Sequence, residues 1–153
     1  MEERAEDNPD RSASIYVAVI SALIEGAYAN FDPWSPVTYI DATARSSAGP
    51  MEVSNVVTNH IPIEVQHRIG EALAARTQVR FIDDPQSVVQ PDSRVRDSGV
   101  LITLAPVPAV GCPVEIGARC YSGPLGRTSC TYIVDGAGAR WRVTGTTGVY
   151  SSS

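Results

Sequence analysis

The spacing of the apolar residues changes along the chain, and this change limits the folds that it can adopt. Two stretches carry apolar residues at helical spacing: Ile15, Val19, Ala22 and Leu23, and then Val65, Ile69, Ala72 and Leu73. After Gly99 the spacing becomes that of β-strands, because every second residue from Val114 to Cys120 is apolar. A chain that starts with helical stripes and ends in a run of strands is predicted to fold as an α+β domain.

Capping and proline signals set the limits of the two predicted helices. Ser12 or Ser14 can cap a first helix that runs to Ala29. Pro62 suits the first position of a second helix, which is predicted to end near Arg76.

Six short segments have the composition of β-strands. They are residues 37–41, 79–82, 100–104, 114–121, 128–135 and 139–147. The turn sequence Asp135-Gly136-Ala137-Gly138 predicts a hairpin between the last two. The predicted fold is therefore two helices packed on a mainly antiparallel, curved sheet of five to six strands, in the order αβαβ followed by ββββ.

Three connecting segments are less regular. Residues 42–50 are small and polar, which predicts a loop, and residues 51–59 fit either a short strand or a turn. Residues 84–98 form a long polar connection with two prolines, and connections of this length often act as lids or are disordered.

The overall composition excludes several classes of protein. The chain has 153 residues and a net charge of −5, whereas nucleic-acid binding requires a basic stripe. No apolar run reaches the roughly 18–20 residues of a membrane-spanning helix, so we expect no contact with a membrane. Residues 1–11 are predicted to be a disordered acidic tail to a single domain of residues 12–153. Because this acidic start does not resemble a secretory leader, we expect a cytoplasmic protein.

The last predicted hairpin resembles that of a group of uncharacterised proteins. Tyr132-Ile133-Val134-Asp135 and Trp141-Arg142-Val143-Thr144-Gly145-Thr146-Thr147-Gly148 are similar to the closing hairpin of small actinobacterial α+β proteins. The resemblance implies a shared scaffold and transfers no catalytic residue. A helix with a curved sheet is also similar in outline to the nuclear-transport-factor-like cone fold, although that fold has no strand between its helices.

Asp41 and His60 are the candidate catalytic residues. Asp41 ends the first predicted strand on the face shared by Val37 and Tyr39. If this face is turned inward, burial would raise the pKa of Asp41 and suit it to acid–base work. His60 lies just before the second helix, where exposed N–H groups favour anions. The alternatives are a turn-forming aspartate and an ordinary loop histidine.

Four further residues are candidates for ligand binding. Trp34 and Tyr39 lie at predicted element ends, where they would line a pocket between helices and sheet. Arg119 and Tyr121 share one face of a strand with Glu115, which suggests an anion-binding sheet face. Cross-strand Glu–Arg pairing on a solvated face is the alternative explanation.

The sequence predicts neither a metal nor a cofactor. Cys112, Cys120 and Cys130 include no Cys-x-x-Cys pair, and buried free thiols are the favoured interpretation. Cys120 and Cys130 lie on adjacent predicted strands, so a disulfide between them stays open. His67 is flanked by Glu64 and Glu71 at helical spacing, which is typical of a solvated helix face.

Three functional hypotheses fit these observations. The first is a small-molecule-binding domain, accessory to a metabolic pathway, with a pocket at Trp34, Tyr39, Asp41, His60 and residues 84–98. The second is a cofactor-independent isomerase, cyclase or hydrolase that uses Asp41 and His60 as acid and base. The third is a structural protein that forms a homo-oligomer through an exposed sheet face or edge.

Overall fold

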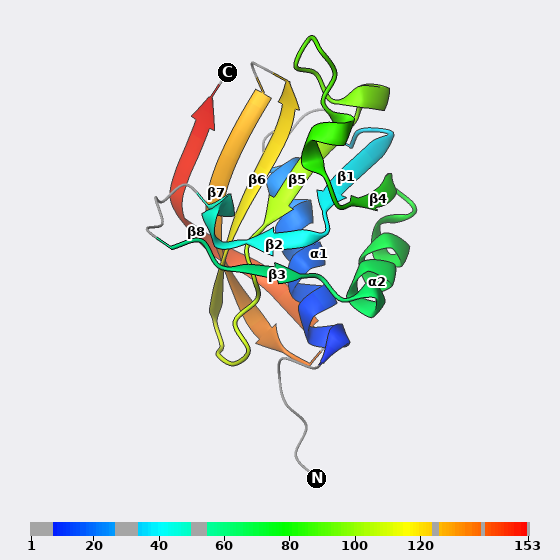
Figure 1. The fold of residues 1–153 in the computed structure, drawn as a ribbon. Coiled ribbons are helices and arrows are strands. Elements are labelled where there is room, and N and C mark those ends of the chain that lie inside the picture. The colour runs from blue at the N-terminus through cyan, green and yellow to red at the C-terminus, as the bar shows by residue number, and fades with distance from the viewer. Residues whose placement is uncertain (1–7, 27–33, 50–54, 124–125, 139, 153) are drawn as a thin grey trace.

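Two α-helices, eight β-strands and three short 3-10 helices make up the fold of the computed structural model (Figure 1), which describes residues 8–26, 34–49, 55–123, 126–138 and 140–152. The two helices are α1 (Pro9–Glu25) and α2 (Ile63–Leu73). The strands are β1 (Val37–Asp41), β2 (Thr43–Arg45), β3 (Thr58–His60), β4 (Gln78–Ile82), β5 (Val100–Leu104), β6 (Val114–Gly123), β7 (Gly126–Ala137) and β8 (Arg140–Ser152). None of the helices described is both long enough and apolar enough to cross a bilayer.

The six predicted strands form one six-stranded sheet in the order β4-β1-β5-β6-β7-β8. The sheet is mixed, because β1 runs parallel to both β4 and β5 while β5 to β8 pair antiparallel. The prediction of an α+β fold is confirmed. The predicted element order is wrong, because β2 and β3 form a separate two-stranded sheet between β1 and α2. Each of these strands has only three residues, too few to show a period of two.

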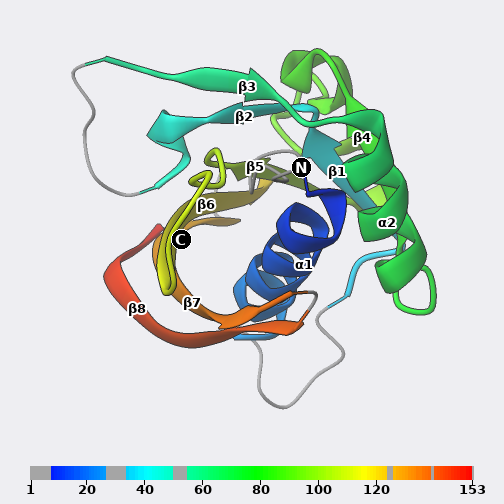
Figure 2. The same cartoon turned by 90° about the horizontal axis from the view of Figure 1, so that it is seen from below.

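The main core lies between α1 and the curved part of the sheet. Figure 2 shows β5 to β8 bending around α1, while α2 lies beside α1 and next to β4. Ile15, Val19 and Ile20 of α1 are fully buried against Ile102 and Ile116 of the sheet. We call this helix-covered side of the sheet the inner face.

Helix α1 begins earlier than the sequence predicts. Asn8, and not Ser12 or Ser14, caps the helix, because its side chain accepts hydrogen bonds from the backbone of Asp10 and Arg11, and a proline takes the first helical position. Residues 9–11 are therefore not part of a disordered tail. Arg11 is buried because its guanidinium donates to two backbone carbonyls of the 105–113 connection and stacks over the Trp141 ring. The predicted helix end at Ala29 and residues 1–7 lie outside the described residues.

The opposite, outer face of the sheet is covered by connecting segments with short 3-10 turns instead of by α-helices. Val37 and Tyr39 of β1 and Leu101 of β5 form a second apolar cluster with Val88 and Val95 of the 84–98 connection. The segment of residues 43–49, which we call the arm, crosses the same face over β6, where it lies against Gly117 and Arg119. The connection predicted to be a lid or disordered is thus packed onto the sheet.

The arm touches the sheet at two glycines. A methyl group on Gly117 of β6 would lie 2.8 Å from the backbone of Gly49, closer than real contacts allow. We therefore expect Gly117→Ala to lower the free energy of unfolding by about 1–3 kcal/mol, measured by urea denaturation. Gly70→Ala on α2, where a methyl group meets nothing within 4 Å, is the control and is expected to stabilise by up to about 1 kcal/mol. A Gly117→Ala protein as stable as wild type would show that the arm does not rest on this glycine.

Candidate functional site

A groove of about 480 Å³ opens where the N-termini of both helices approach the β2–β3 hairpin and the connection after β5. Its lining residues are Asn8, Pro9, Arg11, Ser12, Tyr16, Ala44, Asn59, His60, Ile61, Pro62, Ile63, Glu64, Val65, Pro106 and Val107. A volume of this size lies in the range of sites for small molecules.

The groove has an apolar body with polar groups at its edges. Tyr16, Ile61 and Val65 are buried, whereas Ile63 is exposed at the rim. The Tyr16 hydroxyl donates to the Ala105 carbonyl at 2.9 Å, and burial raises its pKa well above the usual value, so this hydroxyl stays protonated at physiological pH. The other hydrogen-bonding side chains of the lining are Asn8, Arg11, Ser12, Asn59, His60 and Glu64.

His60 lies at this groove, as its position before the second helix suggested. It ends β3, pairs in register with Thr43 of β2, and its side chain is more than half exposed. The Nε2 atom lies 3.9 Å from a carboxylate oxygen of Asp83, which follows β4 and is almost fully exposed. His60 is therefore accessible both to solvent and to a bound molecule.

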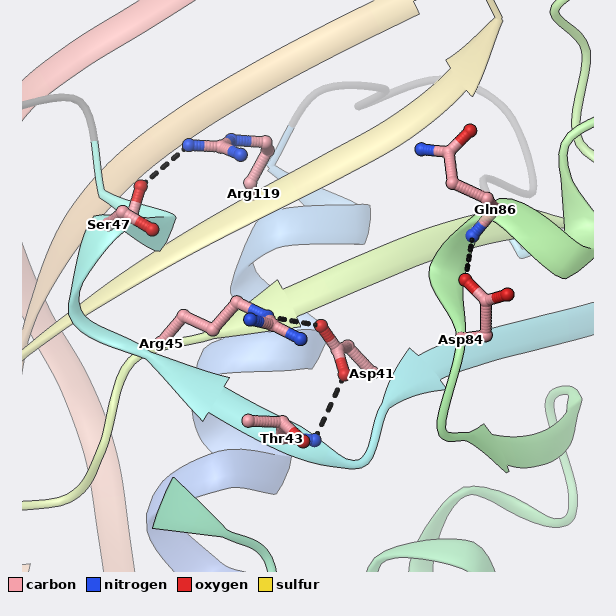
Figure 3. A network of polar contacts seen from close by, with 7 residues as sticks. All are labelled: Asp41, Thr43, Arg45, Ser47, Asp84, Gln86 and Arg119. Carbon is pink, nitrogen blue, oxygen red and sulfur yellow. Dashed lines mark hydrogen bonds and ion pairs between the residues drawn. The ribbon is translucent and has the colours of Figure 1, made fainter. Parts of the chain in front are cut away.

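Asp41 is buried, and hydrogen bonds occupy its carboxylate. It is 1% exposed, and its carboxylate accepts hydrogen bonds from the Thr43 backbone N–H at 3.0 Å and from the Arg45 Nε at 2.8 Å. Figure 3 shows both contacts closing the turn from β1 into β2. Asp41 does not line the groove, and no hydrogen bond or ion pair joins its side chain to His60 among the described residues. Their backbones are nonetheless neighbours, because the N–H of Ile61 donates to the carbonyl of Ala42 at 2.8 Å.

Tyr39 and Trp34 also lie away from the groove. Tyr39 is buried on the outer face, where its hydroxyl donates to the Asp97 carboxylate. Burial, with a smaller contribution from this carboxylate, raises the pKa of Tyr39, and the hydrogen bond from Tyr39 lowers the pKa of Asp97. The Trp34 indole N–H donates to Glu25 at the last residue of α1, at the opposite end of that helix from the groove.

Arg119 and Tyr121 share the outer face of β6, as the alternation predicted. The Arg119 Nη2 atom donates to the Ser47 carbonyl of the arm at 2.6 Å (Figure 3), and the Tyr121 hydroxyl donates to the Ser93 carbonyl at 2.6 Å. No ion pair joins Arg119 to Glu115 within the described ranges, and Glu115 instead accepts from Thr147. The Glu–Arg pairing considered as the alternative explanation is thus not formed.

The three cysteines are free thiols, and Cys112 is the exposed one. Burial raises the pKa of the Cys120 thiol to about 12 and also raises the pKa of Cys130, so both remain protonated near neutral pH. No group of three or more His, Cys, Asp or Glu side chains in the part of the chain that the structure describes is arranged to hold a metal ion.

Sequence reasoning missed most residues of the groove. Arg11 and Ser12 were assigned to the tail and to a helix cap, and Asn59 to an ambiguous segment. The dipeptide Asn8-Pro9, a cap followed by a first-position proline, is the signal that would have placed α1 correctly and brought its N-terminus to this site.

The comparisons with known proteins supply no relative for this chain. No protein-family model, no curated protein and no solved structure matches it. The resemblance to small actinobacterial proteins therefore stays a prediction.

Proposed function

We propose that the protein binds a small molecule in the groove between the N-termini of α1 and α2. The observation that carries the proposal is the lining itself, an open hollow of about 480 Å³ with a buried apolar body and hydrogen-bonding groups around it. This combination is typical of sites that take up most of a ligand's surface and orient it by a few polar contacts.

The lining favours a ligand with an apolar body and a hydrogen-bonding head. Three prolines, at positions 9, 62 and 106, stiffen the walls, because each ring fixes one backbone dihedral angle. A stiff wall loses little entropy when a ligand binds. Both a donor, Ser12, and a carboxylate, Glu64, are present, so the head group is expected to carry both hydrogen-bond donors and acceptors.

Binding without acid–base catalysis is the simpler proposal for this geometry. The Asp41 carboxylate is occupied by Arg45 and the Thr43 backbone, and the ion-pair partner of His60, Asp83, is distant and exposed. A general acid or base must come within hydrogen-bond reach of the substrate, and of these two residues only His60 borders the groove.

The experiment is a thermal-shift screen of small amphipathic molecules, followed by affinity measurement for the compounds that stabilise the protein. We expect Ile63→Ala to weaken binding of those compounds about tenfold, because removal of an apolar side chain at the rim costs roughly 1–2 kcal/mol of binding free energy. Val56→Ala is the matched control, since Val56 is similarly exposed but does not line the groove. Equal affinities of the two variants and wild type would place binding elsewhere and refute the proposal.

A further inference from the structure

Two arginines lie close together on the outer face of β6 and β7. The strand register pairs Arg119 with Ser129 and Tyr121 with Arg127, and residues paired in this way share one face of the sheet. Arg119 and Arg127 are therefore diagonal neighbours, a spacing of roughly 7–8 Å between backbones that long side chains readily bridge. Ser129 belongs to the same face, next to both, and is buried beneath it with 5% exposure.

The two guanidinium groups have no carboxylate partner among the described residues. Arg119 gives one donor to the Ser47 carbonyl, and Arg127 lies over the Tyr121 ring, with its Cζ atom 5.8 Å from the ring centroid. Neither takes part in an ion pair within the described ranges. The lack of a partner is informative because the chain has 17 acidic and 12 basic residues, so carboxylates are in excess.

The neighbouring acidic groups are engaged in other contacts. Glu115, on the same face of β6, accepts a hydrogen bond from Thr147. Asp97 accepts from the Tyr39 hydroxyl and pairs with Arg96. Asp92 accepts from the Arg94 backbone N–H in its own turn. None of these carboxylates forms an ion pair with Arg119 or Arg127. The pKa of Arg119 is lowered first by burial and then by the charge of Arg127.

We propose that Arg119 and Arg127 form a binding site for a phosphate group. A dianionic phosphate matches two guanidinium groups in charge, and its oxygens accept the paired N–H donors that arginine presents. Tyr121 holds the Arg127 guanidinium over its ring and so orders that side chain before the anion arrives. The contact between Arg119 and Ser47 fixes the other guanidinium against the arm.

This site is distinct from the groove. It lies on the outer face of the sheet, whereas the groove is built from the helix N-termini and the β2–β3 hairpin, and the two share no residue. The inference therefore does not depend on the proposed function. Either site can be disproved while the other stands.

The test uses inorganic phosphate as the probe and the backbone amide NMR spectrum of the 16.3 kDa protein as the readout, at constant ionic strength. We expect phosphate to shift the amide signals of β6 and β7 around residues 119–121 and 127–129. Acetate, which carries one charge, is expected to bind at least several-fold more weakly. Arg127→Gln is expected to reduce phosphate affinity about tenfold, since one charge-assisted contact is lost.

Arg142→Gln is the matched control, because it removes one positive charge from the neighbouring exposed edge of the sheet and leaves the pair intact. It is expected to bind phosphate as wild type does. Arg119→Gln tests the second guanidinium, with its urea midpoint measured alongside because Arg119 also holds the arm. Phosphate shifts confined to the N-termini of α1 and α2, or equal affinities of Arg127→Gln and Arg142→Gln, would overturn the proposal.

Discussion

Replacing Asp41 with alanine is expected to lower the free energy of unfolding by about 3 kcal/mol, and the melting temperature by roughly 6–12 °C. The carboxylate is 1% exposed and satisfies both the Thr43 backbone N–H and the Arg45 guanidinium. Its removal leaves a partly buried N–H group and a positive charge without their acceptor. The expected loss lies at the low end for buried ion pairs, because the Arg45 side chain is 37% exposed and regains water.

Asp84→Ala provides the control for this change. Asp84 also accepts a hydrogen bond from a backbone N–H two residues later, that of Gln86 at 3.0 Å (Figure 3). Unlike Asp41, Asp84 is exposed. Asp84→Ala is expected to lower the free energy of unfolding by no more than about 1 kcal/mol. Asp41→Asn keeps one acceptor for the Thr43 N–H. Its free energy of unfolding is expected to lie between those of the two alanine variants. Urea midpoints that do not separate Asp41→Ala from Asp84→Ala would mean that Asp41 has no special structural role.

Stability is expected to fall steeply above about pH 9. The buried Cys120 thiol has its pKa raised from 9.0 to about 12, and burial also raises the pKa values of Tyr16, Tyr39 and Tyr132 above their usual value of 10.0. Between the unfolded and folded pKa values, the folded chain keeps a proton that the unfolded chain has lost. Each such group therefore removes up to roughly 1.4 kcal/mol of stability for every pH unit in that interval.

Urea unfolding at pH 7, 9, 10 and 11, with a reductant present, measures this alkaline loss. Below about pH 9 these groups hold their protons in both states, so their contribution to stability does not change with pH. Cys120→Ala is expected to make the fall between pH 9 and 10 shallower, because this thiol begins to ionise earlier in the unfolded chain than the tyrosines do. If the free energy of unfolding falls equally with pH in Cys120→Ala and in wild type, the alkaline loss of stability does not come from this thiol.

The strands were predictable wherever apolar residues run continuously or alternate over five residues or more. Residues 37–41 and 100–104 were predicted with the bounds that β1 and β5 have in the structure. Parallel pairing of β1 with β4 and β5 was not predictable, because it depends on how the chain crosses between strands and not on their composition. The hairpin after β7 turns later than predicted, since Asp135 and Gly136 are still paired with β8.

The candidate site was only partly predictable because the first strand is buried on both faces. All five residues of β1 are buried, and their alternation gives no sign of which side the helices cover. Tyr39 and Asp41 share a face, as predicted, but it is the outer one. His60, by contrast, was located by its sequence distance from the second helix, a local signal that requires no knowledge of the sheet's orientation.

The irregular pairing of β8 affects how the protein behaves at high concentration. Beside β7, this long strand shifts register twice, so its paired residues fall into runs of 140–143, 145–147 and 150–152. A strand from another molecule that paired with the outer edge of β8 would face the same register shifts. It could keep one register over at most four consecutive residues of β8. Bulged edges of this kind discourage the open-ended stacking that leads to fibres. The 13-residue edge strand β8 is therefore a poor template for aggregation despite its length.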